Sequence, residues 1–277
     1  MNVIVNTPYV FNKRKWYFLS IFYARKKWGE LTAEIMHFYN ERQNQFETYL
    51  VSFSKEKGEN IQVTFVTPEN DNNDYSAEIQ SFFQQFVEQR PSISNVLFPY
   101  GKAIWCNYTN NSLEWNIFRL PAFSDQYVNF HQKTMAVVLN LLEDDFSEDI
   151  FLSTGLYLIT KELCCIDSCN QKNIVSQLHH EISLHSKDQK INQLISKFDR
   201  SAVSNTIESY IYEDENGYST ELIHWLIEVK NLLKIYDFMK LYYITCKILN
   251  INTLNQKVLL ELIFIGYNHI LIGKELT

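Results

Sequence analysis

Hydrophobic and polar residues follow two different spacings along the chain. Ile61, Val63 and Phe65 alternate with polar or small residues, which is typical of a β-strand with one buried face. Residues 16–25 carry large aromatic side chains at both alternating positions, as in a central strand that is covered on both faces. Further along, apolar residues recur every three or four positions, most clearly across residues 222–233, which predicts helices. The pattern therefore changes from strand-like to helix-like along the sequence.

Before Pro121 the pattern predicts seven elements, in the order strand, helix, strand, strand, helix, strand, strand. Their expected ranges are 16–25, 30–43, 46–53, 61–66, 76–90, 102–108 and 113–120. Ser76 is the expected N-cap of the second helix. This order is the split βαβ arrangement of a ferredoxin-like antiparallel sheet with one additional strand.

All five prolines lie within the first 121 residues. Because proline interrupts helices, its absence from the rest of the chain predicts helices throughout. Their expected ranges are 125–145, 149–165, 171–196 with a break, 201–212, 219–250 with a break, and 254–272. We therefore expect an α+β protein with a ferredoxin-like half at 1–121 and an all-helical half at 122–277.

The composition narrows the class of protein. With 46% hydrophobic residues, 17 Tyr and 19 Phe, the chain can bury a substantial core. A formal net charge of -7 argues against nucleic-acid binding, which needs a basic face. No segment approaches the roughly 20 apolar residues of a membrane span, and the first residues lack the apolar stretch of a signal peptide. The five cysteines are irregularly spaced, so we expect reduced thiols and a cytoplasmic location.

Two clusters raise the question of a metal. The first combines thiols and imidazoles: Cys164, Cys165, Cys169, His179, His180 and His185. Structural zinc sites use tighter, paired spacings, so the pattern favours thiols on the buried face of one helix and imidazoles on the exposed face of the next. The second cluster holds five carboxylates at a helix junction: Glu143, Asp144, Asp145, Glu148 and Asp149. Their spacing does not match a calcium-binding EF-hand loop, and acids favour the positive end of the following helix. We expect neither a metal nor another cofactor.

Six cations precede the first acidic residue, Glu30, in this otherwise acidic protein. They are Lys13, Arg14, Lys15, Arg25, Lys26 and Lys27. If 16–25 is a strand, three of them lie at each end of it. An acidic peptide could dock along that edge through backbone hydrogen bonds and charge attraction. The alternative is that they are ordinary solvating charges that flank a hydrophobic strand.

The last helix combines an apolar sequence with polar groups, namely Glu261, Tyr267, Asn268 and His269. Buried polar groups need partners, so these residues form either a satisfied structural network or a functional site. The sequence has no glycine-rich phosphate loop, nucleophile elbow or dinucleotide fingerprint, which argues against nucleotide-dependent chemistry.

Three segments suggest a family. They are 15–19 (KWYFL) with Trp28, 60–65 (NIQVTF) and 267–273 (YNHILIG). In this order they resemble the thiopeptide-type bacteriocin biosynthesis domain, which eliminates glutamate in class I lantibiotic dehydratases and also occurs as stand-alone proteins. The last segment is similar to a drifted form of the family's His-x-x-Asn-Arg-Leu-x-Gly ending, with one extra residue before the glycine.

The chain departs from this family at two places. The family's elimination domains use arginines in a His-Ile-Arg-Leu-Arg-like strand to hold the glutamyl leaving group. The matching strand here has Gln62 and Thr64, which cannot hold a carboxylate in the bidentate way of a guanidinium. The family's histidine in the final helix falls near Phe264 or Ile265, and His269 lies about one turn later. The resemblance therefore implies that the ordinary elimination chemistry is lost.

One branch of the family tolerates this loss. Its members are the thiopeptide pyridine synthases, which join two dehydroalanines in a formal [4+2] cycloaddition and release the leader peptide. The resemblance thus implies a cyclase or lyase that acts on a dehydrated precursor peptide. Its implied partners are other peptide-modifying enzymes of the pathway, and neither nucleic acid nor a membrane is expected as a partner. Its implied catalytic residues are Tyr267 as hydrogen-bond donor or general acid, with Glu261, Asn268 and His269 as neighbours. The strand residues Gln62 and Thr64 and the six cations are its implied substrate contacts.

Two alternatives to a cyclase stay open. The first is a non-catalytic subunit that presents the modified precursor to partner enzymes. The second is a diverged glutamate-eliminating subunit of a split dehydratase.

Overall fold

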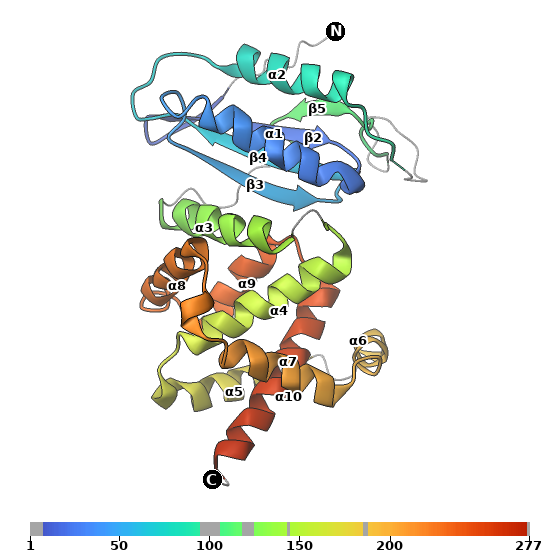
Figure 1. Ribbon diagram of the computed structural model, residues 1–277, viewed down its shortest axis with the longest axis vertical. Helices are drawn as coiled ribbons and strands as arrows, with labels where there is room; N and C mark the ends of the chain where they lie inside the picture. The colour runs from blue at the N-terminus through green and yellow to red at the C-terminus, as the bar shows by residue number, and fades with distance from the viewer. Residues whose placement is uncertain (1–7, 95–105, 118–124, 143–144, 185–187, 276–277) are drawn as a thin grey trace. The chain divides into compact units, whose positions relative to one another are not determined.

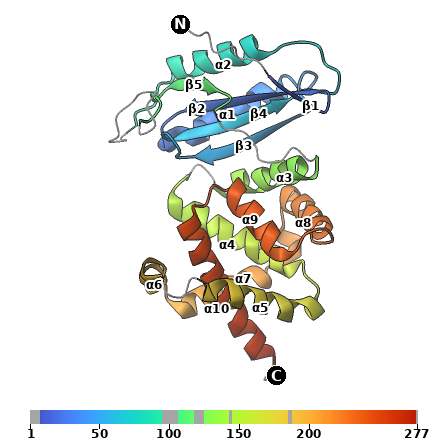
Figure 2. The ribbon, with the colours of Figure 1, turned by 180° about the vertical axis from the view of Figure 1, so that it is seen from behind.

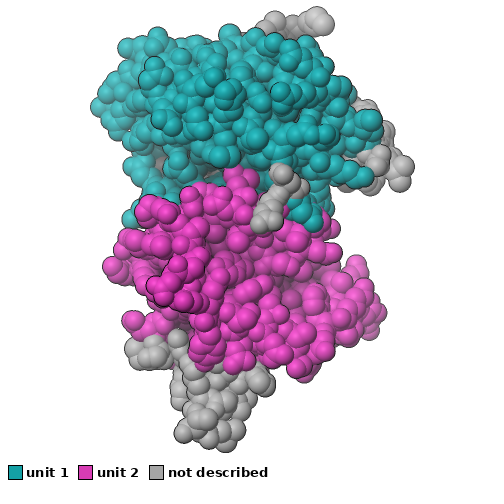
Figure 3. Space-filling view, in the orientation of Figure 1, with its two compact units in different colours: residues 1–135, 143–146 teal, residues 136–142, 147–277 magenta. Residues whose placement is uncertain are grey.

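The computed structural model describes residues 8–94, 106–117, 125–142, 145–184 and 188–275 (Figure 1). The chain divides into two compact units, which Figure 3 shows in different colours. The sheet unit comprises residues 1–135 and 143–146, and the helical unit comprises residues 136–142 and 147–277. The predicted boundary at residues 121 and 122 lies outside the described residues.

The described part of the sheet unit contains five antiparallel strands. They are β1 (Tyr9–Phe11), β2 (Arg14–Phe22), β3 (Thr48–Ser54), β4 (Asn60–Val66) and β5 (Ser112–Trp115). Strand β2 is central, because it pairs with β4 on one side and with both β1 and β5 on the other. Strand β3 follows β4, so the order β5-β2-β4-β3 is that of a ferredoxin-like sheet. This confirms the predicted fold of the first half.

The short strand β1 was not predicted. It forms a hairpin with β2 across Asn12 and Lys13, whose φ angles are 49° and 60°. Two successive residues with positive φ are typical of a type I′ hairpin turn. The predicted strand at 102–108 falls mainly on residues outside the described part of the chain, and the end of the predicted strand at 113–120 does so too.

Helices α1 (Trp28–Asn40) and α2 (Ser76–Gln89) cover one face of the sheet (Figures 1 and 2). Aromatic rings join the layers: the Phe38 and Phe65 ring centroids are 5.1 Å apart, and those of Phe65 and Phe83 are 6.1 Å apart. The N-cap of α2 is Tyr75, and Ser76 is its first helical residue. The predicted N-cap is therefore wrong by one position, because Asp74 accepts the hydrogen bonds from the Ser76 backbone N–H and hydroxyl.

The opposite sheet face carries the even-numbered residues of β2, β3 and β4. Trp16, Phe18, Leu50 and Val66 form an apolar cluster there. Val128, from helix α3 (Asp125–Leu142), packs against this cluster. The other end of the same face is polar, and it contains Gln62 and the residues described below.

All further described elements are helical, as predicted. They are α4 (Glu148–Cys164), α5 (Ser168–Ser183), α6 (Gln189–Ile195), α7 (Arg200–Ile211), the 3-10 turns η1 (Arg25–Lys27) and η2 (Glu215–Gly217), α8 (Thr220–Leu232), α9 (Phe238–Ile248) and α10 (Thr253–Glu275). The two predicted breaks are confirmed between α5 and α6 and between α8 and α9. None of the described helices has the length and apolar composition needed to cross a bilayer.

Helix α10 crosses the helical unit and packs closely on α7 (Figure 2). A Cβ atom at Gly266 would lie 2.9 Å from the Cβ atom of Ile207, which is closer than real Cβ atoms come. Glycine at this position therefore permits the close approach of the two helices. The approach fixes the part of α10 that carries Tyr267.

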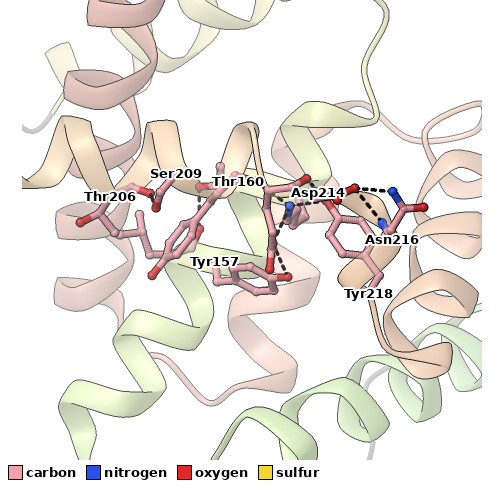
Figure 4. A network of polar contacts seen from close by, with 11 residues as sticks. Tyr157, Thr160, Thr206, Ser209, Asp214, Asn216 and Tyr218 are labelled. Atoms are coloured by element: carbon pink, nitrogen blue, oxygen red, sulfur yellow. Dashed lines mark hydrogen bonds and ion pairs between the residues drawn. The ribbon is translucent and has the colours of Figure 1, made fainter.

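A buried ammonium group joins α4 to α7 and to the segment before α8 (Figure 4). The Lys161 side chain is 2% exposed. Its Nζ donates to the Tyr210 carbonyl oxygen at 2.6 Å and to the Tyr218 hydroxyl, and it lies 2.8 Å from Glu213 Oε2. The Tyr157 hydroxyl donates to the same carboxylate at 2.9 Å. All three ammonium protons thus have acceptors, which a buried cation requires.

The next residue, Glu162, is fully buried between α4 and α9, with 0% exposure. Its Oε1 accepts a hydrogen bond from the Thr245 hydroxyl, and its Oε2 has no partner in the described part of the chain. Burial raises the pKa of this carboxyl to about 8. Because the charged form is poorly solvated here, Glu162 is protonated at neutral pH.

We expect Glu162 to make the protein less stable as pH rises. The folded pKa of about 8 lies above the ordinary value of 4.5 for a glutamic acid, so the folded state keeps its full stability below pH 4.5 and loses stability as pH rises toward 8. Each pH unit in this window costs the folded state about 1.4 kcal/mol. Urea unfolding of the wild type and Glu162→Gln at pH 5, 7 and 8.5 measures the effect. Parallel pH profiles for the two proteins would contradict the expectation.

Candidate functional site

The terminal helix places its candidate residues on different faces. Glu261 and Tyr267 are six residues apart, which is about 120° around a helix of 3.6 residues per turn. Glu261 and Asn268 are seven residues apart and therefore share a face. Glu261 and Asn268 therefore lie on one face of α10, two turns apart, and Tyr267 lies on another face. The side chain of His269 lies outside the described residues.

Tyr267 is 5% exposed, and burial raises its pKa to about 12, with the nearby Cys164 thiol adding to the shift. Its hydroxyl therefore keeps its proton throughout the physiological pH range. Burial also raises the pKa of the half-buried Glu261, and nearby Arg200 opposes this shift. The chemistry available from this helix is therefore donation of a hydrogen bond by a neutral phenol.

The sheet unit carries a second polar constellation. Gln62 of β4 pairs with Ser20 of β2 on one side and with Ser52 of β3 on the other. Ser20 also pairs with Glu114 of β5. Paired residues of antiparallel strands point to the same face, so these four side chains form a row across the sheet. We call Glu114, Ser20, Gln62 and Ser52 the polar row.

A histidine continues the polar row from helix α3. His131 is 1% exposed, and its Nε2 lies 2.7 Å from the Val51 carbonyl oxygen and 3.3 Å from Ser52 Oγ. Because a carbonyl oxygen only accepts, Nε2 carries the proton and donates it to Val51. Burial lowers the pKa of His131 to about 4, so the imidazole is neutral. Its Nδ1 is buried and has no hydrogen-bond partner in the described part of the chain.

The polar row offers neutral hydrogen-bonding groups. Thr64, two residues from Gln62, points to the same face and is buried. Hydroxyls and a carboxamide can orient a peptide backbone, but they do not supply the positive charge that holds a free carboxylate. Glu114 adds a negative charge at one end of the row. The polar row therefore lacks the positive charge that would hold a glutamyl leaving group.

The six amino-terminal cations lie only partly where they were predicted: Arg14 and Lys15 are the first residues of β2 rather than flanking it, and the last three form η1. Several of the six are used within the fold. Arg14 pairs with Glu47 at 3.1 Å and with Asp125 at 3.0 Å. Lys15 Nζ donates to the Asn73 carbonyl oxygen at 2.6 Å. Arg25 contacts the Trp28 ring, and Lys27 pairs with Glu30. Lys13, Lys26 and Lys27 are exposed.

Strand β2 has neighbours on both sides. Its backbone therefore does not offer the hydrogen bonds that a docking peptide was expected to form along this edge. The six cations remain a proposed binding surface through charge alone.

Of the two clusters considered for a metal, the first departs in part from the expectation. Cys164 is exposed and Cys165 is half-buried, so the interpretation of both as buried thiols is wrong. His179 and His180 are exposed, as expected, whereas the side chain of Cys169 and residue His185 lie outside the described residues. Glu148 and Asp149 occupy the first turn of α4, where acids favour the helix end. Within the described residues no group of three or more His, Cys, Asp or Glu could hold a metal ion.

Two solved structures share this architecture. The pyridine synthase TbtD from thiomuracin biosynthesis superposes with a TM-score of 0.65 at 10% identity, over 92% of this chain and 98% of that one. TsrL superposes with a TM-score of 0.59 at 9% identity, over 92% and 95%. The chain has a thiopeptide pyridine synthase-like fold. No protein-family model and no curated protein sequence matches it significantly.

The polar row was missed by sequence reasoning, apart from Gln62. Ser20 and Ser52 are ordinary small residues within hydrophobic strands, and only the strand register aligns them with Gln62. His131 lies in an amphipathic helix and has no motif around it. The one local signal is its position four residues after Tyr127. The two rings meet edge-on, with their centroids 5.9 Å apart.

Proposed function

We propose that the chain is a cyclase that joins two dehydroalanines of a ribosomally made precursor peptide in a formal [4+2] cycloaddition. The observation that carries the proposal is the likeness in fold to the pyridine synthase TbtD over 92% of the chain. The uncharged groups of the polar row, Ser20, Gln62 and Ser52, support it, because the reaction needs a peptide folded so that its two alkenes meet. Holding reacting groups together contributes on the order of 7–11 kcal/mol to lowering such a barrier.

The proposed roles follow the chemistry of each group. Tyr267 donates a hydrogen bond or a proton as the backbone amide tautomerises and as water and the leader peptide depart. Its raised pKa keeps the phenol protonated for this role. Gln62 and Thr64 bind the peptide backbone, and Glu261, Asn268 and His269 assist on α10. The exposed Lys13 and Lys26 attract an acidic leader peptide.

The experiment is an incubation of the purified protein with a precursor peptide that bears two dehydroalanines and its leader. Mass spectrometry should detect a macrocycle and a free leader peptide that accumulate together. A precursor that binds but returns unchanged would end the cyclase proposal.

One alternative has a specific observation in its favour. The low exposure of Tyr267, at 5%, is also what a structural tyrosine would show. A non-catalytic subunit that binds the precursor is therefore the second candidate. Glutamate elimination is disfavoured, because the polar row contains Glu114 and no arginine. Offering a glutamylated precursor and measuring released glutamate tests that third activity.

A further inference from the structure

A cavity of about 660 Å³ opens within the helical unit, apart from the residues proposed above. Residues at the end of α4, on α5 and in the connection from α8 to α9 line it. Figures 1 and 2 show where these elements lie in the helical unit. Ligand sites of proteins span about 300–1,000 Å³, so the cavity is large enough for several residues of a peptide.

Helix α5 lines the cavity with three carboxamides, Asn170, Asn173 and Gln177. The spacings of three and four residues place them on one face of the helix. None of them forms a side-chain hydrogen bond with another described residue. Each carboxamide offers both donors and an acceptor, the combination that pairs with a peptide N–H and C=O.

The spacing of Asn173 and Gln177 matches an extended chain. Asn173 and Gln177 are separated by four residues of helix, or about 6 Å at 1.5 Å per residue. Two residues of an extended peptide rise about 6.4–6.8 Å, which is the repeat of backbone groups that point in one direction. These two carboxamides can therefore contact backbone groups two residues apart in an extended peptide that lies along α5.

The facing wall is charged. Lys230 and Lys234 are four residues apart and both exposed, and Lys230 has no ion-pair partner in the described part of the chain. Asp237 is already used as the N-cap of α9, where its Oδ1 accepts from the Lys240 backbone N–H at 2.7 Å. Asp167 makes no capping bond at the start of α5 and can accept from a peptide N–H. Two ammonium and two carboxylate groups therefore line the cavity, and the two ammonium groups can bind carboxylates of a ligand.

Apolar side chains complete the cavity. The buried Ile174 and Phe238 and the half-buried Tyr236 are among its lining residues. An extended peptide alternates its side chains, so it can present acidic groups to the lysines and small or apolar groups to these residues.

We propose that this cavity binds an extended peptide segment with alternating acidic and small side chains. Asn170, Asn173 and Gln177 bind its backbone, and Lys230 and Lys234 bind its carboxylates. The proposal rests on the proposed function only for the source of the segment, which would be the precursor peptide. Binding is measured without turnover, so failure here and failure of cyclisation are distinguishable.

Fluorescence anisotropy with three labelled hexapeptides, (Ala-Glu)₃, (Ala-Gln)₃ and (Ala-Lys)₃, tests the proposal. We expect the full chain to bind the Glu peptide best. The double variant Lys230→Ala/Lys234→Ala should weaken the binding of the Glu peptide about tenfold and leave the Gln peptide unchanged. Asn173→Leu should weaken both, because it removes backbone contacts. Lys190→Ala and Asn205→Leu, at exposed positions on α6 and α7, are the matched controls and should bind as wild type.

A charge reversal keeps the test decisive. Lys234→Glu should shift the preference toward the Lys peptide, a gain that unfolding cannot produce. Equal binding of the three peptides, or wild-type affinity of the double lysine variant for the Glu peptide, would overturn the proposal. Inorganic phosphate is the remaining probe: if phosphate binding depends on the two lysines while no peptide binds, the cavity is a simple anion site and the peptide proposal is wrong.

Discussion

Tyr267→Phe should lower the rate of cyclisation at least about 100-fold and leave the affinity for the precursor unchanged. The substitution removes one hydroxyl from a buried ring and keeps its packing. General acid catalysis by a positioned side chain contributes about 10²- to 10⁴-fold, which sets the expected loss. Single-turnover kinetics with a dehydroalanine precursor, together with a binding titration, measures the two effects separately.

The matched control is Tyr243→Phe. Tyr243 is exposed on α9, and its hydroxyl donates to Glu181 at 3.4 Å. Its loss should leave both rate and affinity unchanged. If Tyr267→Phe turns over at the wild-type rate, this phenol is not the acid or donor of the reaction. The raised pKa also predicts that the wild-type rate shows no alkaline decline from Tyr267 until pH approaches 12.

Lys161→Met should lower the free energy of unfolding by about 2–4 kcal/mol. Methionine fills a similar volume but leaves the Tyr210 carbonyl, the Tyr218 hydroxyl and the Glu213 carboxylate without their donor. Hydrogen bonds to charged groups contribute about 1.5–3 kcal/mol each. Removing one partner of a buried pair costs more stability than replacing both partners by apolar residues. Urea unfolding monitored by circular dichroism measures the loss.

Burial alone would lower the pKa of Lys161, but hydrogen bonds to Glu213 and Tyr218 outweigh it and raise the pKa. Its stabilisation is therefore complete at neutral pH and is lost only as pH rises through the elevated value. Lys240→Met is the control, because Lys240 is exposed on α9 and contacts only the Tyr236 ring among the described residues. Its expected effect is within about 0.5 kcal/mol. Equal losses for the two variants would contradict the structural role of the Lys161 network.

The sequence predicted the helices and the four main strands because the hydrophobic pattern that specifies each element lies within a short stretch of the chain. Leu31, Ile35 and Phe38 follow the spacing of one helix face, and in the structure all three lie in the core. The hairpin of β1 was missed for a local reason as well. Its turn residues, Asn12 and Lys13, adopt positive φ without the glycine that usually marks such turns.

The site could be predicted only in part. Gln62 and Thr64 were identified through a family resemblance, but strand register alone joins Ser20 and Ser52 to Gln62. The sequence also suggested six free cations, whereas Arg14 meets Glu47 and Asp125, acids that are distant in sequence. Pairings of this kind depend on the tertiary structure, so the spacing of residues in a single sequence does not reveal them.

The most direct test of the cyclase proposal is the mass balance of a single turnover. The precursor with two dehydroalanines should disappear as one macrocycle, one leader peptide and one water, with masses that sum to that of the precursor. A precursor in which either dehydroalanine is replaced by alanine should bind and remain intact. Two results would contradict the account. One is release of the leader from a precursor with a single dehydroalanine. The other is a precursor with two dehydroalanines that binds the protein and keeps its original mass.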